Sequence, residues 1–529
     1  MIELKSISIY IIVALIFVLY WIIVFTLDKH GILRKYNISA YFGLLLVIRT
    51  MRGQKFLDKL ATPKGFWRIF ANFGVPLMLI SMFSMFLIFI YIVYLIIVYS
   101  PSHLSQESLG ETIRMSLFIP GINPFLPFVW GWIALIVTLI VHEFAHAILC
   151  KVEGIRVKSM GILYAIIPLG GFAEPDEEQL FGVENTNKKV ATRKEKIRIL
   201  TAGVMANFVV AFIALALFFG PVLGAIAPID QDVRVMIAPD IEQSGIYEKM
   251  VVTQINDTKI KNVSDFFGYM DSTESGANVR IYATNYQEDK VYEVKVIKGI
   301  VINQVVKGSP AEDIGLKKGM ILTKINNISL TNISDFINFM NSTQAGDEVK
   351  VQVLSNNSIN ATLMIFKVKL TKHPLENINK GFLGVSYDRE SAHLRLTGIE
   401  FGVFSAKEYL QEQRAIPYML NKLKGWFYMF ILAIEYPGFS GMLLHFYEPT
   451  GWATYLGNGI FILANLLLWI GWVNFYVGVF NCLPAIPLDG GHVFRDLVKS
   501  NSITLVFSIA IWSSLIFMIL GPYIIPKIM

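Results

Sequence analysis

Val141-His142-Glu143-Phe144-Ala145-His146 is the stretch around which the rest of the chain is arranged, and it ends a long apolar run, residues 127–140. Residues four apart lie on one face of a helix, so His142 and His146 can direct two imidazoles at one metal ion. Glu143, one position round, could take a proton from water at that ion. Alternatively, two histidines close a membrane helix near its water edge, although two His and a Glu in an apolar helix are costly without a function.

The composition is typical of an integral membrane protein. The chain has 529 residues, of which 54% are hydrophobic and 16% charged, and its mean hydropathy is +0.53. The charged residues gather in two basic loops and in one long insertion, residues 228–400. The formal net charge of +6 comes without a basic groove with interleaved aromatic residues. It therefore indicates orientation at a lipid bilayer, and no nucleic-acid partner is expected.

Six apolar runs are long enough to be transmembrane helices. They comprise residues 7–27, 75–98, 127–150, 199–223, 460–480 and 503–524. The first run has no small-residue cleavage site after it, so we expect it to be retained. Residues 426–434 form a shorter run that Pro437 and Gly438 close. We expect the segment 401–450 to be interfacial or re-entrant, without crossing the membrane.

Basic residues set the expected orientation. Lys and Arg greatly outnumber acidic residues in the loop 28–73, and they gather again between the third and fourth runs, in residues 151–198. Both loops are therefore expected to be cytoplasmic, which puts the N-terminus and the insertion outside. Two apolar patches in the first loop, residues 41–47 and 66–73, are expected to lie along the membrane surface as amphipathic pieces.

The insertion contains an internal repeat. Residues 252–266 align with residues 322–336 at a constant offset. Each copy predicts a strand, a turn, a short helix capped by Ser264 or Ser334, and then alternating strands. We therefore expect two tandem β-rich domains.

The boundaries of these two domains are expected at residues 228–300 and 301–400. The two cysteines, Cys150 and Cys482, both lie outside the insertion. A disulfide framework is therefore excluded for it.

The second copy resembles PDZ domains. Ser309-Pro310-Ala311 precedes Ile314-Gly315-Leu316, and Gly381-Phe382-Leu383-Gly384 resembles the loop with which those domains bind a peptide carboxylate. The first copy has Lys249 where the second has Gly319, so it lacks part of this signature. The resemblance implies that peptide C-termini bind as an added strand. Alternatively, the two domains act as rigid spacers or filters.

A catalytic zinc site needs three protein ligands and an open position, so a third ligand must be found. The metzincin spacing fails, because Leu149 stands where its glycine would be. The remaining candidate is Asn481-Cys-Leu-Pro484-Ala-Ile-Pro-Leu-Asp489-Gly-Gly-His492, where two prolines and two glycines interrupt an apolar run. Broken helices at membrane depth line protein or a wet cavity, which makes Asp489 a candidate ligand. Alternatively, Asp489 caps the short helix that follows.

Together, the two motifs resemble those of the site-2 protease family of intramembrane zinc metalloproteases. Carried over by matching residues, the resemblance implies one Zn²⁺ per chain, held by His142, His146 and Asp489, with Glu143 as the general base. Asn481 and Pro484 match the companions of the family's aspartate, which are thought to help bind the substrate or its reacting carbonyl.

The resemblance extends to two further elements. Residues 168–172, including Gly170 and Gly171, resemble the family's membrane-associated β-element, which pairs with an extended substrate. Gly203 and Asn207 match its glycine-x-x-x-asparagine helix. From the residues alone, Asn207 could equally bond a neighbouring helix, since an unpaired amide in hydrocarbon is costly.

The expected fold is a polytopic α-helical membrane protein of about six transmembrane helices with an inserted extracytoplasmic tandem PDZ-like region. Its membrane core comprises residues 127–223 and 451–529. Residues 1–100 form a two-helix extension with a basic cytoplasmic loop, which the core family does not need. If residues 426–438 do not cross the membrane, Asp489 reaches the same cytoplasmic side as His146.

The implied function is cleavage of transmembrane or membrane-anchored proteins within or near the bilayer, as in regulated intramembrane proteolysis. A single-pass membrane protein is the expected substrate. Two alternatives remain. The chain could be a membrane-anchored zinc protease that acts on soluble segments, or a non-enzymatic metal-binding scaffold or transporter with PDZ modules.

Overall fold

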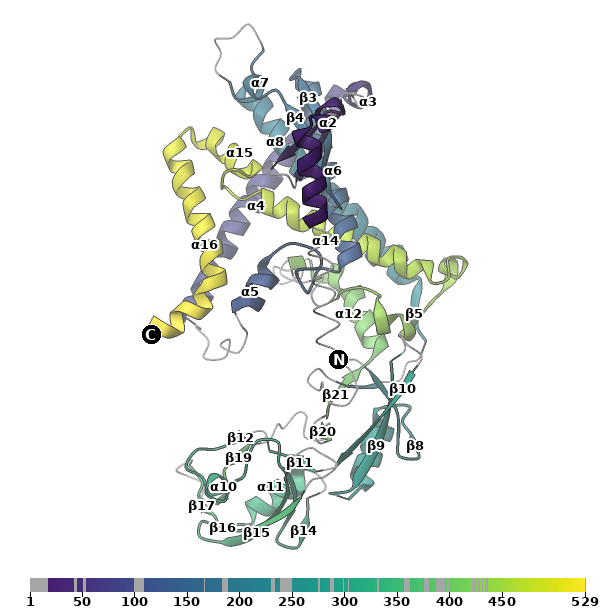
Figure 1. Ribbon diagram of the computed structural model, residues 1–529, viewed down its shortest axis with the longest axis vertical. Helices are drawn as coiled ribbons and strands as arrows, with labels where there is room; N and C mark the ends of the chain where they lie inside the picture. Colours follow the sequence, from purple (N-terminus) through teal and green to yellow (C-terminus); the bar gives the residue numbers. More distant parts are fainter. Residues whose placement is uncertain are drawn as a thin grey trace. The chain divides into compact units, whose positions relative to one another are not determined.

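The computed structural model of the chain forms two compact units (Figure 1). The helical unit comprises Met1–Gly224, Ile416–Gly438 and Gly459–Met529, and the inserted unit comprises Ala225–Ala415 and Phe439–Asn458. The structure describes residues 18–41, 45–50, 54–98, 109–165, 167–182, 189–229, 234–237, 250–274, 276–285, 290–297, 299–302, 304–330, 333–355, 362–374, 380–386, 395–396, 399–420, 425, 429–430, 432 and 436–528.

Five helices of the described residues are long and apolar enough to cross a membrane. They are α4 (Lys64–Val98), α6 (Phe128–Glu153), α8 (Arg193–Leu217, continued by the π-helical turn η1, Phe218–Val222), α14 (Gly459–Asn481) and α16 (Asn501–Ile528). They correspond to five of the six expected runs. The remaining run, residues 7–27, lies mostly outside the described residues, although residues 18–29 are helical. Most of 426–438 also lies outside them.

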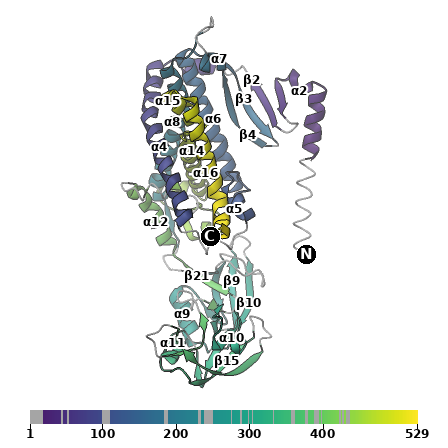
Figure 2. The same cartoon turned by 90° about the vertical axis from the view of Figure 1, so that its left-hand side faces the viewer.

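The helices α6, α8 and α14 pack against one another, and α4 packs against α8 (Figure 2). Small residues make these contacts close. A Cβ on Gly74 of α4 would lie 3.0 Å from Met205 Cβ of α8, and a Cβ on Gly471 of α14 would lie 2.6 Å from Leu215 Cγ. Helices in lipid have no hydrophobic driving force for association, so the van der Waals packing at such close contacts stabilises the helix pairs.

A four-stranded antiparallel sheet lies beside these helices (Figure 2). Its order is β1 (Ile38–Tyr41), β2 (Leu45–Thr50), β3 (Val157–Ala165) and β4 (Ile167–Pro175). Residue 41 and residues 45–47 are therefore strand residues of this sheet, and their position at the membrane surface stays a prediction. Without β2, the edge of β3 would have unpaired backbone groups. The strand β2 pairs with this edge from Leu46↔Tyr164 to Thr50↔Met160. The other expected surface piece, residues 66–73, lies within α4.

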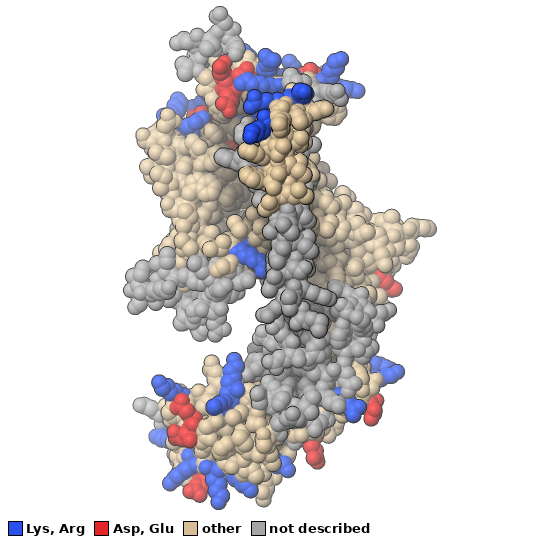
Figure 3. Space-filling view, in the orientation of Figure 1, with Lys and Arg blue, Asp and Glu red and all other residues tan. Residues whose placement is uncertain are grey.

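Short helices complete the helical unit. They are α2 (Ile32–Lys35), α3 (Gln54–Leu60), α5 (Leu109–Ser116), α7 (Glu177–Phe181) and α15 (Asp489–Val498). Leu57 of α3 is fully buried in one apolar cluster with Leu149 of α6 and Val157 of β3. The N-terminal loop is thus built into the helical unit. In Figure 3, Lys and Arg gather at the end of this unit where α2 and α3 lie.

The inserted unit contains two sheets built on the expected repeat. The first has the order β10 (Lys290–Ile297), β9 (Asn278–Asn285), β7 (Val251–Ile255), β6 (Arg234–Ile237), β21 (Ile399–Phe404) and β20 (Arg395–Leu396), with β8 (Thr258–Lys259) beside β7. The second has the order β11 (Ile300–Val301), β13 (Ile321–Ile325), β15 (Glu348–Leu354) and β16 (Leu363–Lys369), with β14 (Ile328–Ser329) beside β13. The helices α9 (Val263–Ser272) and α11 (Ile333–Asn341) occupy equivalent places in the chain.

The repeat is confirmed in detail by two asparagines. Asn256 and Asn326 both have positive φ, 47° and 52°. Each side-chain oxygen accepts a hydrogen bond of 2.8 Å from a backbone N–H 24 residues further on. One expectation is wrong here, because Asn262 and not Ser264 caps α9 by accepting from Asp265 N.

Two expected boundaries also differ from the structure. The strand β20 and the start of β21 come from the segment assigned to the second domain, and the rest of β21 comes from the segment 401–450, but both strands extend the first sheet through β6. Residues 401–450 are divided between the units. They contain α12 (Ala406–Met419), η2 (Gly441–Phe446) and β22 (Tyr447–Pro449), which pairs with β5 (Ile226–Pro228) and is followed by η3 (Gly451–Tyr455). The residues of a strand such as β21 do not show which of two sheets the strand joins.

Short elements complete the second domain: β12 (Gln304–Val305), α10 (Pro310–Asp313), β17 (Thr371–Lys372), β18 (Gly381–Phe382) and β19 (Val385–Ser386). The strand β12 pairs with β19, and β17 pairs with β18.

The close packing of α4 on α8 gives a direct test. Replacing Gly74 by Leu should lower the free energy of unfolding by about 1–3 kcal/mol, because the larger side chain forces the helices apart. Thermal unfolding of the purified protein in detergent measures this. Gly65→Leu in the same helix is the control, since a Cβ there meets nothing within 4 Å. Equal melting temperatures for the two variants would contradict the described contact.

Candidate metal centre

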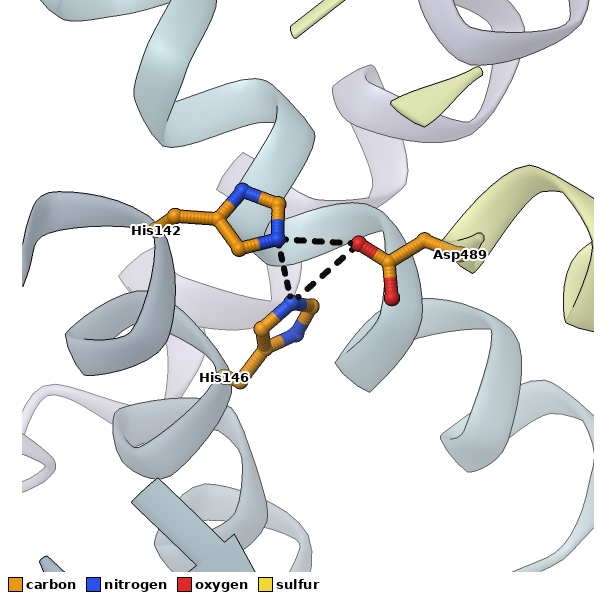
Figure 4. Close-up of side chains that lie close together, drawn as sticks. All are labelled: His142, His146 and Asp489. Atoms are coloured by element: carbon orange, nitrogen blue, oxygen red, sulfur yellow. Dashed lines mark hydrogen bonds and ion pairs between the residues drawn. The ribbon is translucent and has the colours of Figure 1, made fainter. Parts of the chain in front are cut away.

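Three side chains from two distant parts of the sequence converge in the helical unit (Figure 4). His142 Nε2 and His146 Nε2 lie 3.0 Å apart, and Asp489 Oδ2 lies 3.0 Å from the first and 3.3 Å from the second. This is the only group of this kind that occurs among the described His, Cys, Asp and Glu residues. The structure thus brings together the three ligands that the sequence motifs suggested.

The histidines come from one face of α6, and Asp489 is the first residue of α15. The chain between Asn481 and Asp489 folds back on itself, and Gly490 and Gly491 permit this. A Cβ on Gly490 would lie 2.6 Å from the Leu483 carbonyl oxygen, and a Cβ on Gly491 would lie 2.6 Å from that of Ala485. The two glycines therefore let the start of α15 sit against the preceding loop, which points Asp489 at the histidines.

Groups on α8 contact the Nδ1 atom of each histidine, the ring nitrogen that faces away from Asp489, and so fix the orientation of both rings. His146 Nδ1 lies 2.7 Å from the carbonyl oxygen of Ile199, to which it donates. His146 Nε2 then carries a lone pair toward Asp489. A carbonyl behind a ligating histidine is a common way to fix its tautomer.

Asn207 of α8 contacts the Nδ1 atom of His142 in the same way. Its side-chain Nδ2 lies 3.2 Å from His142 Nδ1, the residue is fully buried, and Oδ1 has no hydrogen-bond partner among the described residues. The two ends of an amide are interchangeable in such a contact. With the oxygen toward the ring, Nδ1–H donates to Asn207, and Nε2 of His142 is also left with a lone pair. Asn207 therefore faces the site rather than an unrelated helix.

Gly203 lies between these two contacts on α8. A Cβ at this position would be 2.7 Å from His142 Cε1 and 2.8 Å from His146 Cε1, and would also meet His146 Nε2. The ring edges thus occupy the space of a side chain. Only glycine lets α8 approach the two histidines this closely.

Glu143 lies next to the sheet. Its Oε2 accepts a hydrogen bond of 3.3 Å from Ala173 N of β4. This amide points away from β3, and because amides alternate along a strand, that of Gly171 points to the same side. In the described part of the chain no strand pairs with this edge of β4. An unpaired strand edge therefore runs up to the Glu143 carboxylate.

The donor set fits a zinc ion. Tetrahedral zinc with ligand bonds near 2.0–2.1 Å separates its ligand atoms by about 3.3 Å, close to the three separations here. Asp489 Oδ2 is buried and, apart from the two ring nitrogens, has no polar partner among the described residues. Two neutral imidazoles and a carboxylate match the ligand types of catalytic zinc sites. His142, His146 and Asp489 could hold the ion.

The other expected site residues are spread more widely. Asn481 is the last residue of α14, and Pro484 is buried in the loop before Asp489. Gly170 and Gly171 lie in β4, paired with Leu163 and Ile162 of β3.

The expected PDZ carboxylate loop lies in the inserted unit. Gly381 and Phe382 form β18, Leu383 is buried, and Gly384 has a φ of 89°. Sequence reasoning missed the Ile199 carbonyl and the Ala173 amide near the metal centre, because backbone groups leave no residue-type signal.

Gly203 provides a test of this geometry. Gly203→Ala should weaken zinc binding about 10–100-fold, because the added methyl displaces the two rings. Competition with a chromogenic zinc chelator measures this in purified protein. Gly220→Ala, where a Cβ meets nothing within 4 Å, should bind zinc normally. Unchanged affinity in Gly203→Ala would refute the close approach of α8.

Relatives of this chain include proteases. It is 25% identical over 288 residues to an uncharacterized protein of Methanocaldococcus jannaschii, covering 54% of this chain and 67% of that protein. It is 24% identical over 416 residues to protease RseP of Yersinia pestis, covering 68% and 88%. It is 24% identical over 421 residues to regulator of sigma-E protease RseP of Salmonella typhimurium, again covering 68% and 88%.

One solved structure, the PDZ domain of the SdrC-like protein from Listeria monocytogenes, matches with 23% identity and a TM-score of 0.15, covering 19% of this chain and 98% of that one. The sequence model of peptidase family M50 matches residues 130–521. That range contains α8, α15 and all of α6 except its first two residues, and hence the complete histidine–aspartate cluster. The chain therefore belongs to peptidase family M50, the site-2 protease family of membrane metalloproteases.

Proposed function

We propose that this chain is a zinc endopeptidase that cleaves transmembrane or membrane-anchored proteins within or near the bilayer. The observation that carries the proposal is the convergence of His142, His146 and Asp489 between helices apolar enough to cross a membrane. Buried polar groups of this kind are costly in an apolar bundle, and a bound cation offsets the cost.

The chemistry is hydrolysis of a peptide bond. When bound, Zn²⁺ supplies Lewis acidity that activates water and polarises the scissile carbonyl. Glu143 takes the proton that water loses as its oxygen joins the carbonyl carbon, and gives it to the leaving amine as the C–N bond breaks. Ile199 and Asn207 contact the Nδ1 atoms of His146 and His142, which leaves both Nε2 atoms facing the position that the ion would take.

The substrate must be extended when it reacts. The carbonyl groups of a transmembrane helix are engaged in their own hydrogen bonds, so the helix has to unwind locally. The unpaired edge of β4 can then receive the unwound segment as an added strand. Because Glu143 accepts from Ala173 N at this edge, a strand paired there would bring its carbonyls close to the general base. Asn481 and Pro484 are proposed to support the reacting carbonyl.

Orientation and the insertion complete the proposal. Lys and Arg gather at the end of the helical unit that carries α2 and α3, which the positive-inside rule assigns to the cytoplasm. His146 lies toward that end of α6, so water would enter from the cytoplasmic side. The PDZ-like pair would lie outside, where it could bind peptide C-termini through residues 381–384 or exclude bulky ectodomains before cleavage. This arrangement suits regulated intramembrane proteolysis.

The role of Glu143 can be tested by one isosteric change. Glu143→Gln should lower the rate of cleavage about 10²–10⁴-fold, because the amide cannot take a proton, while the zinc content stays at one per chain. Cleavage of a transmembrane peptide in detergent and elemental analysis measure the two quantities. Glu177→Gln, in the exposed first turn of α7, is the matched control and should leave both unchanged. Full activity in Glu143→Gln would rule out the assigned role.

The substrate class distinguishes the alternatives. We expect a single-pass peptide to be cut inside its apolar segment, with cleavage lost when a zinc chelator is added and recovered with Zn²⁺. Mass spectrometry of the fragments locates the cut. An unfolded soluble protein serves as the comparison and should remain intact. Cleavage of the soluble protein alone would favour a membrane-anchored protease of ordinary specificity, and cleavage of neither would favour a metal-binding scaffold or transporter.

A further inference from the structure

A second group of charged side chains is buried at the end of α6, away from the metal centre. Glu153, the last residue of α6, has a side chain that is only 1% exposed. Arg68 donates from Nε to its Oε1 at 3.2 Å and from Nη2 to its Oε2 at 2.9 Å. Arg198 donates from Nη1 to Oε1 at 3.1 Å. We call these three residues the Glu153 clamp.

The clamp joins three helices. Arg68 comes from α4, and Arg198 comes from α8. Arg198 Nε also donates to Asn72 Oδ1 of α4 at 2.9 Å, so α4 and α8 are bridged directly. Lys189, just before α8, donates to the backbone carbonyl of Glu153. The end of α6 is therefore held from both neighbouring helices.

A carboxylate at this position is unfavourable by itself. The C-terminal end of a helix carries a partial negative charge, and burial removes the hydration of the carboxylate. Two guanidinium groups compensate for both effects, but only in a geometry that lets their planar forks meet the oxygens. Sliding or rotating α6 against α8 would leave a buried charge unpaired. The clamp therefore selects one register of the helices.

That register also sets the metal centre. Glu153 lies seven residues after His146, two turns along the same face of α6 and about 10 Å away along the axis. Arg198 immediately precedes Ile199, whose carbonyl accepts from His146 Nδ1. A shift of α8 along α6 would move the Ile199 carbonyl and the Asn207 amide away from both rings at once.

We propose that the Glu153 clamp positions the metal ligands. It holds α8 against α6 so that Ile199 and Asn207 keep His142 and His146 turned toward Asp489. Glu153, Arg68 and Arg198 touch neither the metal nor the substrate, so they are positioning residues. Through Arg68, the N-terminal extension becomes part of the apparatus that shapes the site. The inference rests on the proposed function in that it requires His142, His146 and Asp489 to bind zinc.

The experiment measures metal binding by the purified full-length protein in detergent. Glu153→Gln and Arg68→Gln should each weaken zinc affinity about 10–100-fold in competition with a chromogenic chelator, because outer partners of the ligands are disturbed. The visible absorption bands of the cobalt-substituted protein should change in position or intensity. Arg68→Lys, which keeps the charge but not the planar fork, should give an intermediate affinity.

Two control variants separate positioning from general stability. Asp58→Asn breaks the 2.9 Å ion pair with Lys151 at the same end of α6, but the Asp58 side chain is 60% exposed, so zinc affinity should not change. Phe89→Ala removes a buried side chain from α4 far along the helix from Arg68. It should lower the melting temperature and leave zinc affinity and the cobalt spectrum unchanged.

Wild-type zinc affinity and a wild-type cobalt spectrum in both Glu153→Gln and Arg68→Gln would overturn the proposal. If Glu153→Gln fails to fold, Arg68→Gln decides alone, because the Arg68 side chain is 45% exposed and its replacement disturbs less of the buried core. A wild-type protein that binds no zinc would overturn the proposed function as well. The two failures are therefore distinguishable in one set of measurements.

Discussion

The structure depends on the burial of two imidazoles and one carboxylate between apolar helices. Such groups are stable there only when every polar atom has a partner, and this requirement determines the surroundings of the site. Ile199 and Asn207 satisfy the rear nitrogens of the two rings, and Gly203 makes room for both. Gly490 and Gly491 let the chain double back so that Asp489 reaches the front. Only the space between the three ligand atoms is left for a cation. The close approach of α8 to α6 follows from this constraint, because the Ile199 carbonyl and the Asn207 amide have to reach the two rings on α6.

Sequence reasoning found the parts of this arrangement that residue types reveal. The four-residue spacing of His142 and His146 fixes their common face on any helix, and the proline- and glycine-rich break marks Asp489 as unusual. The strand–turn–helix repeat of the insertion is also predicted from the sequence, and the positive φ of both Asn256 and Asn326 confirms it. The sequence does not reveal which distant strands pair with one another. Nothing local in residues 38–50 shows that they extend β3, and nothing in residues 395–404 shows that they join the first sheet of the insertion. Backbone partners such as the Ile199 carbonyl are invisible for the same reason.

The N-terminal segment is an integral part of the helical unit, as its contacts show. From the sequence it was an addition to a core that begins near residue 127. In the structure, β2 completes the sheet whose last strand reaches Glu143, Leu57 enters the core around the end of α6, and Arg68 closes a buried charge cluster there. The helix α4 also packs on α8 through Gly74. An apolar helix can be an accessory anchor, but one that shares buried polar groups with the ligand-bearing helix constrains the register of that helix. The membrane core of this chain therefore begins well before its metal-binding motif.

The most direct measurement is X-ray absorption at the zinc K-edge, made on the purified wild-type protein and on Asp489→Asn. The wild type should contain one zinc per chain with only nitrogen and oxygen neighbours at about 2.0–2.1 Å and the outer scattering of two imidazoles. Asp489→Asn should lose zinc or show an altered first shell, while the imidazole signal of any zinc that remains persists. A wild-type protein without zinc, a sulfur neighbour at about 2.3 Å, or a spectrum unaffected by Asp489→Asn would contradict a centre built from His142, His146 and Asp489.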